Sequence, residues 1–312
     1  MPFLKHIPRP FQWLLKLLFT AIALWLLVRK IDFTQLMETV KGASWIWLVL
    51  CTVLQLPIAI VNALRWKILH RIPGLPLRKY VYYVFIGNTL SMFLPSAALA
   101  EGARAFAFGK RYGGITGNFA AAIFARGCGF LVQLAVLILF VFMFRESLSR
   151  LPLWNGLRLD ASVGALLLLM AVALAILGGF LAVRFQARLR QVVAVFAGYM
   201  RSPGTVAWIL LLSVVMQGLL AVSTYTLFKT VGWELTWWHA VVVPPLIQML
   251  LLLPVSFGGV GVREYLALVL YGQLAGVPSE KTVAASLLAY IPLLVVSAGT
   301  GAWMAYRKAK AG

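Results

Sequence analysis

Residues 239–273 read HAVVVPPLIQMLLLLPVSFGGVGVREYLALVLYGQ, an apolar run that is interrupted at its centre by the stretch 254–259. Each half has about 12 to 17 residues, whereas an α-helix needs about 20 residues to cross a bilayer. The run therefore predicts a helical hairpin that enters a membrane, turns near its middle and leaves by the same side. Residues 80–108 have the same form, with Leu94-Pro95-Ser96 at the interruption. Two full spans over 80–108 would leave the sides of the other segments unchanged, so charge placement is compatible with either form.

The composition of the whole chain agrees with a membrane solvent. Hydrophobic residues make up 62% of the 312, charged residues only 12%, and the mean hydropathy is +0.93. Ordinary soluble domains are about half apolar, so this chain cannot hide its apolar surface from water. We therefore expect one all-α, polytopic transmembrane domain over residues 1–312, with two re-entrant hairpins and about six spanning helices. The expected spans are 11–28, 43–64, 117–144, 162–183, 204–228 and 281–305.

Charge placement predicts how the chain is oriented. The net charge is +20, but the Lys and Arg residues flank apolar runs, where positive residues set topology and meet anionic headgroups. This pattern argues against nucleic acid as a partner. Most of these residues fall in five segments that the layout puts on one side, which predicts that both termini are cytoplasmic. The segments are 1–10, 65–79, 109–116, 184–203 and 306–312.

The two interrupted runs belong to similar stretches of sequence. Arg104 follows Pro95 by nine residues, and Arg263 follows Pro254 by nine. A polar residue, Arg126 or Tyr290, then lies about nine residues into the span that follows each hairpin. Two similar units of opposite orientation are typical of transporters. We therefore predict an inverted repeat, with residues 43–144 as one unit and 204–305 as the other.

Charges inside the apolar runs are the candidate functional residues. A charge at a helix centre costs about 2.5–3.5 kcal/mol to insert, so each must be paired, hydrated or bound to a ligand. Glu101 and Arg104 are three apart, which predicts an ion pair on one helix face. Arg126 either neutralises Glu101 or joins Arg104 and Arg263 around a cavity that accepts a phosphate, since arginine pairs well with phosphate oxygens.

The glycines of the second interruption offer a second way to hold an anion. Gly258, Gly259 and Gly261 permit backbone conformations that turn N–H groups towards a ligand. They could equally serve only to make a tight turn. The remaining charge there is Glu264, which we expect, together with Glu101, to be a charge partner or a proton carrier. The sequence has no zinc motif, nucleophile elbow or phosphate-binding loop, so we expect no metal and no cofactor.

Two stretches, LPSAALAEGAR at 94–104 and LPVSFGGVGVRE at 253–264, resemble the lysylphosphatidylglycerol synthase transmembrane-region family of flippase-like proteins. The resemblance covers roughly residues 10–305. It implies movement of an anionic lipid, either a phospholipid or a polyprenyl-phosphate-linked lipid, across a bacterial inner membrane. The family's soluble synthase domain has no counterpart in the sequence up to Gly312, so we expect a translocation module and not an enzyme.

Other functions are compatible with the same residues. The chain could be a membrane transferase acting on a lipid phosphate, with Glu101 or Glu264 as a base. It could also be an accessory subunit of a lipid or envelope synthesis complex, in which the internal charges only hold the hairpins together. Membrane lipids with anionic headgroups are the expected partners, and a homodimer or envelope-synthesis partners are further expectations.

Overall fold

Helices account for nearly all of the chain that the computed structural model describes. The described residues are 25, 29, 31–70, 72–93, 97–143, 194–250 and 261–309, and they contain no strand. The short helix α3 covers Phe33–Lys41. The other labelled helices are α4 (Trp45–Leu69), α5 (Leu77–Phe93), α6 (Ala97–Tyr112), α7 (Ile115–Met143), α12 (Pro203–Thr230), α13 (Trp237–Leu250), α14 (Val262–Ala275), α15 (Ser279–Leu288) and α16 (Tyr290–Ala309). Residues 194–200, before α12, are also helical.

Four helical stretches among the described residues are long and apolar enough to cross a membrane. They are α4, most of α7, α12, and α15 with the first half of α16. These match the predicted spans 43–64, 117–144, 204–228 and 281–305. The predicted spans 11–28 and 162–183 lie outside the described residues. The all-α architecture is therefore confirmed for the described part of the chain.

The last of these spans is divided at Ala289, where the sequence had suggested one helix over 281–305. Pro292 explains the division. A proline ring clashes with the carbonyl four residues earlier, here that of Leu288, and proline has no N–H with which to continue the helical ladder. Helix α15 accordingly ends at Leu288 and α16 begins at Tyr290.

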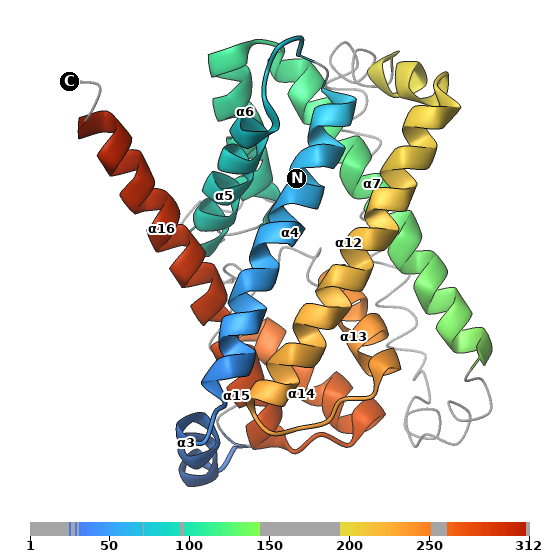
Figure 1. The fold of residues 1–312 in the computed structure, drawn as a ribbon. Helices are drawn as coiled ribbons and strands as arrows, with labels where there is room; N and C mark the ends of the chain where they lie inside the picture. The colour runs from blue at the N-terminus through green and yellow to red at the C-terminus, as the bar shows by residue number, and fades with distance from the viewer. Residues whose placement is uncertain are drawn as a thin grey trace, which may run out of the picture.

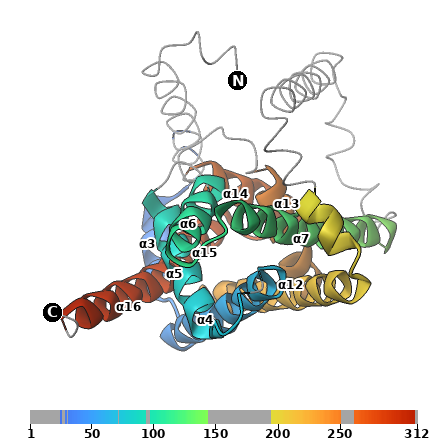
Figure 2. The same cartoon turned by 90° about the horizontal axis from the view of Figure 1, so that it is seen from above.

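Helices α4 and α12 pack against each other and run in opposite directions (Figures 1 and 2). The amide of Ser44, before α4, donates to the carbonyl of Thr230 at the end of α12 (2.8 Å). Each of these helices is followed by two shorter ones, α5 and α6 after α4, and α13 and α14 after α12. Each short pair begins and ends at one end of the bundle, and the two pairs use opposite ends (Figure 1). The connecting residues, with Pro95 and Pro254, lie outside the described residues.

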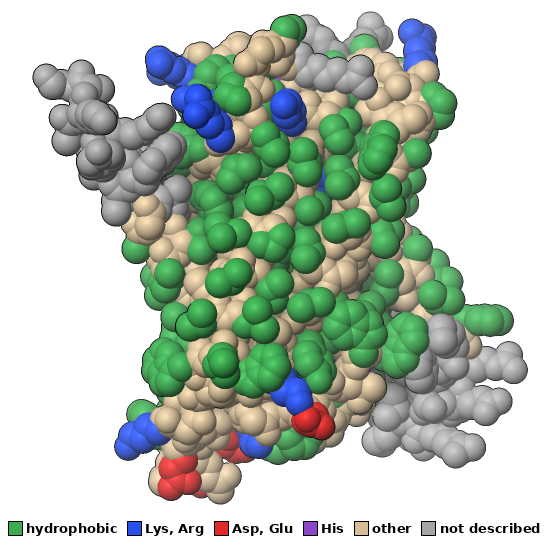
Figure 3. Space-filling view, in the orientation of Figure 1, with side chains coloured by type: hydrophobic (Ala, Val, Ile, Leu, Met, Phe, Trp, Pro, Cys, Tyr) green, Lys and Arg blue, Asp and Glu red, His purple; other side chains and the backbone are tan. Residues whose placement is uncertain are grey.

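The two ends of the bundle differ in charge. At the end where α5 begins and α6 ends, the described charged side chains are all basic, and we call it the basic end: Lys67, Arg78, Lys79, Lys110, Arg111 and Arg201. The opposite end mixes both signs: Arg29, Asp32, Glu38, Lys41, Lys229, Glu234, Glu280 and Lys281. Figure 3 shows acidic side chains only at the latter end of the face it presents, with a broad apolar band between the ends. Such a band suits the hydrocarbon layer of a bilayer.

Candidate functional site

Glu101 lies between two arginines, one on α6 and one on α7. Helix α6 carries Glu101 and Arg104 one turn apart, and Arg104 Nη2 donates to Glu101 Oε1 at 3.2 Å. Arg126 Nη1, from α7, donates to the other carboxylate oxygen, Oε2, at 2.6 Å. The ion pair predicted within α6 is present, and Arg126 makes the contact with Glu101 that was one of the two alternatives left open by the sequence.

Arg104 is enclosed by protein. Only 4% of the residue is exposed, and its guanidinium lies 4.6 Å from the centroid of the Trp66 ring on α4. On α5, Gly87 faces the same side chain so closely that a Cβ there would come within 2.8 Å of Arg104 Cδ. Arg104 therefore fills a gap between α4 and α5, and its position depends on both helices.

Arg126 differs from Arg104 because its side chain is 46% exposed. With Glu101 it forms the charged part of the wall of a cavity of about 920 Å³ between α6, α7, the helical residues 194–200 and α12. The rest of the wall is almost wholly apolar: Gly102, Phe119, Ala122, Ile123, Phe124, Gly127, Cys128, Phe130, Leu131, Phe196, Met200, Val206 and Leu210. A charged pair on an otherwise apolar wall suits an amphipathic ligand.

A third arginine, Arg65 on α4, was missed by the sequence analysis, which placed residues 65–79 in a cytoplasmic segment outside the predicted span 43–64. The structure continues α4 to Leu69 and leaves Arg65 only 7% exposed. Its guanidinium donates to the backbone carbonyl of Ala125 on α7, and it is close enough to interact electrostatically with Glu101 and Arg104. This region therefore brings three guanidinium groups near one carboxylate.

In the second unit the carboxylate of Glu264 is held by neutral groups. Glu264 is 3% exposed. Its Oε2 accepts from the backbone N–H of Gly261 at 2.6 Å, which caps the start of α14, and its Oε1 accepts from the Tyr290 hydroxyl at 2.9 Å. The Ser286 hydroxyl lies 3.5 Å from Oε1. Gly261 has φ +80°, a conformation that side-chain-bearing residues rarely adopt.

Arg263 points to the same tyrosine. Its guanidinium lies 5.6 Å from the centroid of the Tyr290 ring, and within the described residues it forms no ion pair. The structure thus gathers Arg104 and Arg126 around Glu101 and gives Arg263 different neighbours. Whether one cavity serves all three arginines, as the sequence suggested, stays a prediction. Gly258 and Gly259 lie outside the described residues.

The carboxylates of Glu101 and Glu264 are bound in similar ways in the two predicted repeat units. In each, a carboxylate on the second short helix is bound by a residue from the spanning stretch that follows, which is α7 for Glu101 and α15 with α16 for Glu264. The separation along the chain is 25 residues for Glu101 and Arg126, and 26 for Glu264 and Tyr290. Between the units, Gln133 Nε2 on α7 donates to Gln248 Oε1 on α13 at 3.1 Å.

A metal site is not evident among the described residues, which contain no group of three or more His, Cys, Asp or Glu placed to hold an ion. In comparisons with known proteins, the family model described as lysylphosphatidylglycerol synthase TM region matches residues 13–298. No curated protein and no solved structure matches the chain. The family match and the apolar helices together identify a multi-pass membrane protein.

Proposed function

Because this chain belongs to the lysylphosphatidylglycerol synthase transmembrane-region family, we propose that it moves an anionic lipid, a phospholipid or a polyprenyl-phosphate-linked lipid, across the membrane. The family match itself supports a role connected with lipids. The finer assignment, a flippase-like transporter, is ours. It depends on one observation, the half-exposed Arg126 on the wall of an apolar cavity.

The charge balance around that cavity favours an anion as the ligand. Glu101 neutralises at most one of the two arginines that bind it, and buried Arg65 adds further positive charge nearby. Burying unbalanced charge is costly, so a phosphate at Arg126 would lower the energy of the cluster. Arg126 can turn from Glu101 to a phosphate because the carboxylate keeps its bond to Arg104, while the lipid chains occupy the apolar wall.

The arrangement of the helices supports an alternating mechanism. We infer that α5–α6 and α13–α14 are re-entrant hairpins of an inverted repeat, which open to opposite sides of the membrane in turn. The positive-inside rule favours placing the basic end, and both termini, on the cytoplasmic side of a bacterial inner membrane. Glu101 and Glu264 would then hold the hairpins between transfer steps.

Transport in proteoliposomes tests the proposal. Fluorescent phosphatidylglycerol would be placed in the inner leaflet, and its arrival in the outer leaflet followed by quenching with an impermeant reductant. We expect Arg126→Gln to lower the transfer rate at least tenfold, because hydrogen bonds to charged groups are each worth about 1.5–3 kcal/mol. Arg126→Lys should restore part of the rate, since it keeps the charge but loses the planar fork.

Arg111→Gln is the matched control, because it removes an exposed arginine at the basic end that does not line the cavity. Equal rates for Arg126→Gln and Arg111→Gln would contradict the proposal, as would equal transfer of phosphatidylcholine. If wild type transfers no lipid, and swapping the charges of Glu101 and Arg126 preserves folding, the accessory-subunit function would replace transport.

A further inference from the structure

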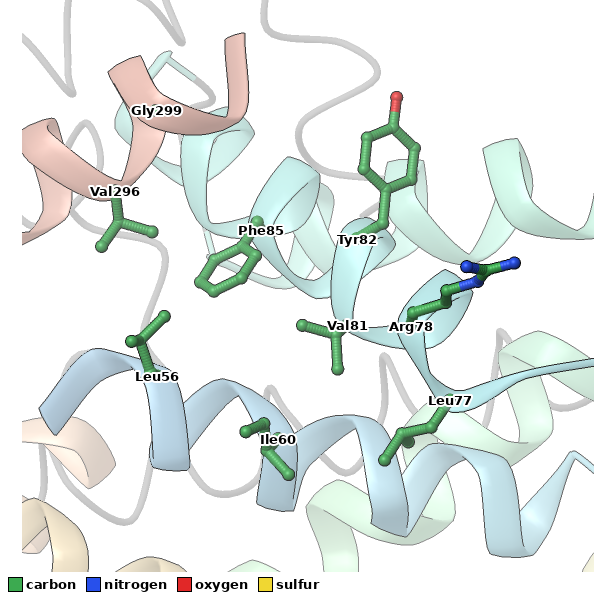
Figure 4. Close-up of a pocket in the computed structure, with 9 residues that line it drawn as sticks. All are labelled: Leu56, Ile60, Leu77, Arg78, Val81, Tyr82, Phe85, Val296 and Gly299. Atoms are coloured by element: carbon green, nitrogen blue, oxygen red, sulfur yellow. The ribbon is translucent and has the colours of Figure 1, made fainter. Parts of the chain in front are cut away.

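A second hollow lies on a different face of the bundle, between α4, α5 and α16. It has a volume of about 650 Å³ and shares no lining residue with the cavity at Arg126. Figure 4 shows its lining: Leu56 and Ile60 on α4, Leu77, Arg78, Val81, Tyr82 and Phe85 on α5, and Val296 and Gly299 on α16. We call this hollow the α16 groove.

The floor of the groove is apolar and open. Leu56 is 51% exposed and Ile60 42% exposed, although both are large aliphatic side chains in the middle of a spanning helix. Helix α16 diverges from α4 and α5 towards its C-terminal end (Figures 1 and 2), so we infer that the groove is open at its side. In a bilayer, such an opening faces hydrocarbon chains and not water.

The groove has one polar end. Arg78 lies in the first turn of α5, at the basic end, and its guanidinium points away from Val296 and Gly299 (Figure 4). Phe85 follows Arg78 by seven positions on the same helix, so the groove extends about 10 Å inwards from the level of the arginine. Within the described residues Arg78 has no acidic side chain at ion-pair distance, and the charged side chains around it at this end are all basic.

We propose that the α16 groove is a binding site for one anionic phospholipid, with the lipid phosphate at Arg78 and an acyl chain between α4, α5 and α16. A phosphate complements the arginine, and a chain complements the exposed aliphatic floor. The site is separate from the cavity of the proposed transport route and does not depend on transport. It can still influence that route, because α5 also carries Gly87, against which Arg104 packs.

Photocrosslinking in nanodiscs tests the proposal. The probe is phosphatidylglycerol with a photoreactive diazirine in the middle of one acyl chain, and phosphatidylcholine with the same chain is the comparison. We expect adducts on peptides that contain Leu56–Ile60 and Val296–Gly299. Arg78→Met keeps the apolar stem and removes the charge. It should reduce the preference for phosphatidylglycerol roughly fivefold, the effect of about 1 kcal/mol per basic residue beside an anionic headgroup.

Filling the groove is the second arm of the experiment. A Cβ at Gly299 would meet nothing within 4 Å, so Gly299→Phe places a ring in open space and should remove most of the adduct. Gly218→Phe on α12 is the matched control, because a Cβ at Gly218 would also meet nothing within 4 Å and Gly218 lies outside the groove. Lipid adducts that are insensitive to both Arg78→Met and Gly299→Phe would overturn the proposal.

Two other results would also decide the question. Crosslinks between two copies of the chain at Val296 or Leu56 would make the groove a dimer interface and overturn the lipid assignment. The lipid assignment of the α16 groove can also be tested independently of the proposed transport function. In Arg126→Gln protein the groove adduct should persist even where transfer is lost, so the failure of one proposal does not imply failure of the other.

Discussion

Replacing Glu101 by glutamine tests how the charged cluster contributes to stability. The pair to examine is Arg104–Glu101, because the Arg104 side chain is only 5% exposed and that of Glu101 is 26% exposed. Removing one partner of a fully buried ion pair costs about 3–5 kcal/mol, mainly because the other charge is left buried without compensation. Protein does not fully enclose Glu101, so we expect Glu101→Gln to cost less, about 2–3 kcal/mol.

The second bond of Glu101 should contribute little to this value. The Arg126 side chain is 46% exposed, and ion pairs of such exposure are worth no more than about 1 kcal/mol. Arg126→Met should therefore destabilise the protein far less than Glu101→Gln. The double variant Glu101→Gln/Arg104→Met should recover much of the loss, because replacing both partners of a buried pair by apolar or neutral groups is often close to neutral.

Unfolding by sodium dodecyl sulfate in mixed micelles, followed by tryptophan fluorescence, gives the comparison. The chain has 11 tryptophans, and Trp66 contacts the cluster directly. The reasoning would be refuted if Glu101→Gln shifted the midpoint no more than Arg126→Met does. It would also fail if Glu101→Gln/Arg104→Met were less stable than Glu101→Gln alone, since the buried cation would then not be the source of the cost.

Two further predictions use the same unfolding measurement. Gly261→Ala should destabilise by at least about 1–2 kcal/mol because Gly261 has φ +80°, whereas Gly218→Ala on α12 should be neutral or stabilising; equal effects would contradict this. Burial lowers the pKa of His70 below its ordinary value of about 6.5, so the folded protein favours the neutral ring. The neutral His70 ring should contribute fully to the free energy of unfolding above pH 6.5, and this contribution should decrease as the pH falls below that value. His70→Gln should therefore flatten this part of the plot of stability against pH. An unchanged profile in His70→Gln would assign the pH dependence to other groups.

Much of the helical architecture could be predicted because long apolar runs are a strong local signal. The four spans in the described residues follow from hydropathy alone, and the division at Ala289 follows from Pro292 once its clash with Leu288 is considered. The C-terminal end of α4 was harder to predict from the sequence. Hydropathy drops at Arg65, but the helix continues because Trp66 and Leu69 are buried against other helices, which is a tertiary effect.

The contacts of the candidate site also differ in how well the sequence could predict them. The Glu101–Arg104 pair is local, so the spacing of three residues was sufficient to predict it. Arg126 could be linked to Glu101 because an unpaired charge in a membrane is costly and few partners exist. The Tyr290–Glu264 bond gave a weaker signal, since a hydroxyl carries no charge, and only its position in the second unit singled it out. Arg65 bonds to a backbone carbonyl, which leaves no trace in the sequence.

The difference between the two carboxylates has a consequence for the mechanism. Glu101 shares its charge between two arginines, while Glu264 is satisfied by Gly261 and Tyr290 and leaves Arg263 without a carboxylate partner among the described residues. Each predicted unit therefore retains guanidinium charge that is not fully cancelled. In the first, one carboxylate is shared by two arginines; in the second, the carboxylate is bound by neutral groups instead of by Arg263. If both carboxylates formed exclusive ion pairs, an anionic lipid would have to break one at each unit. The observed arrangement lowers that cost at both carboxylates, as the proposed transfer of a lipid phosphate would require.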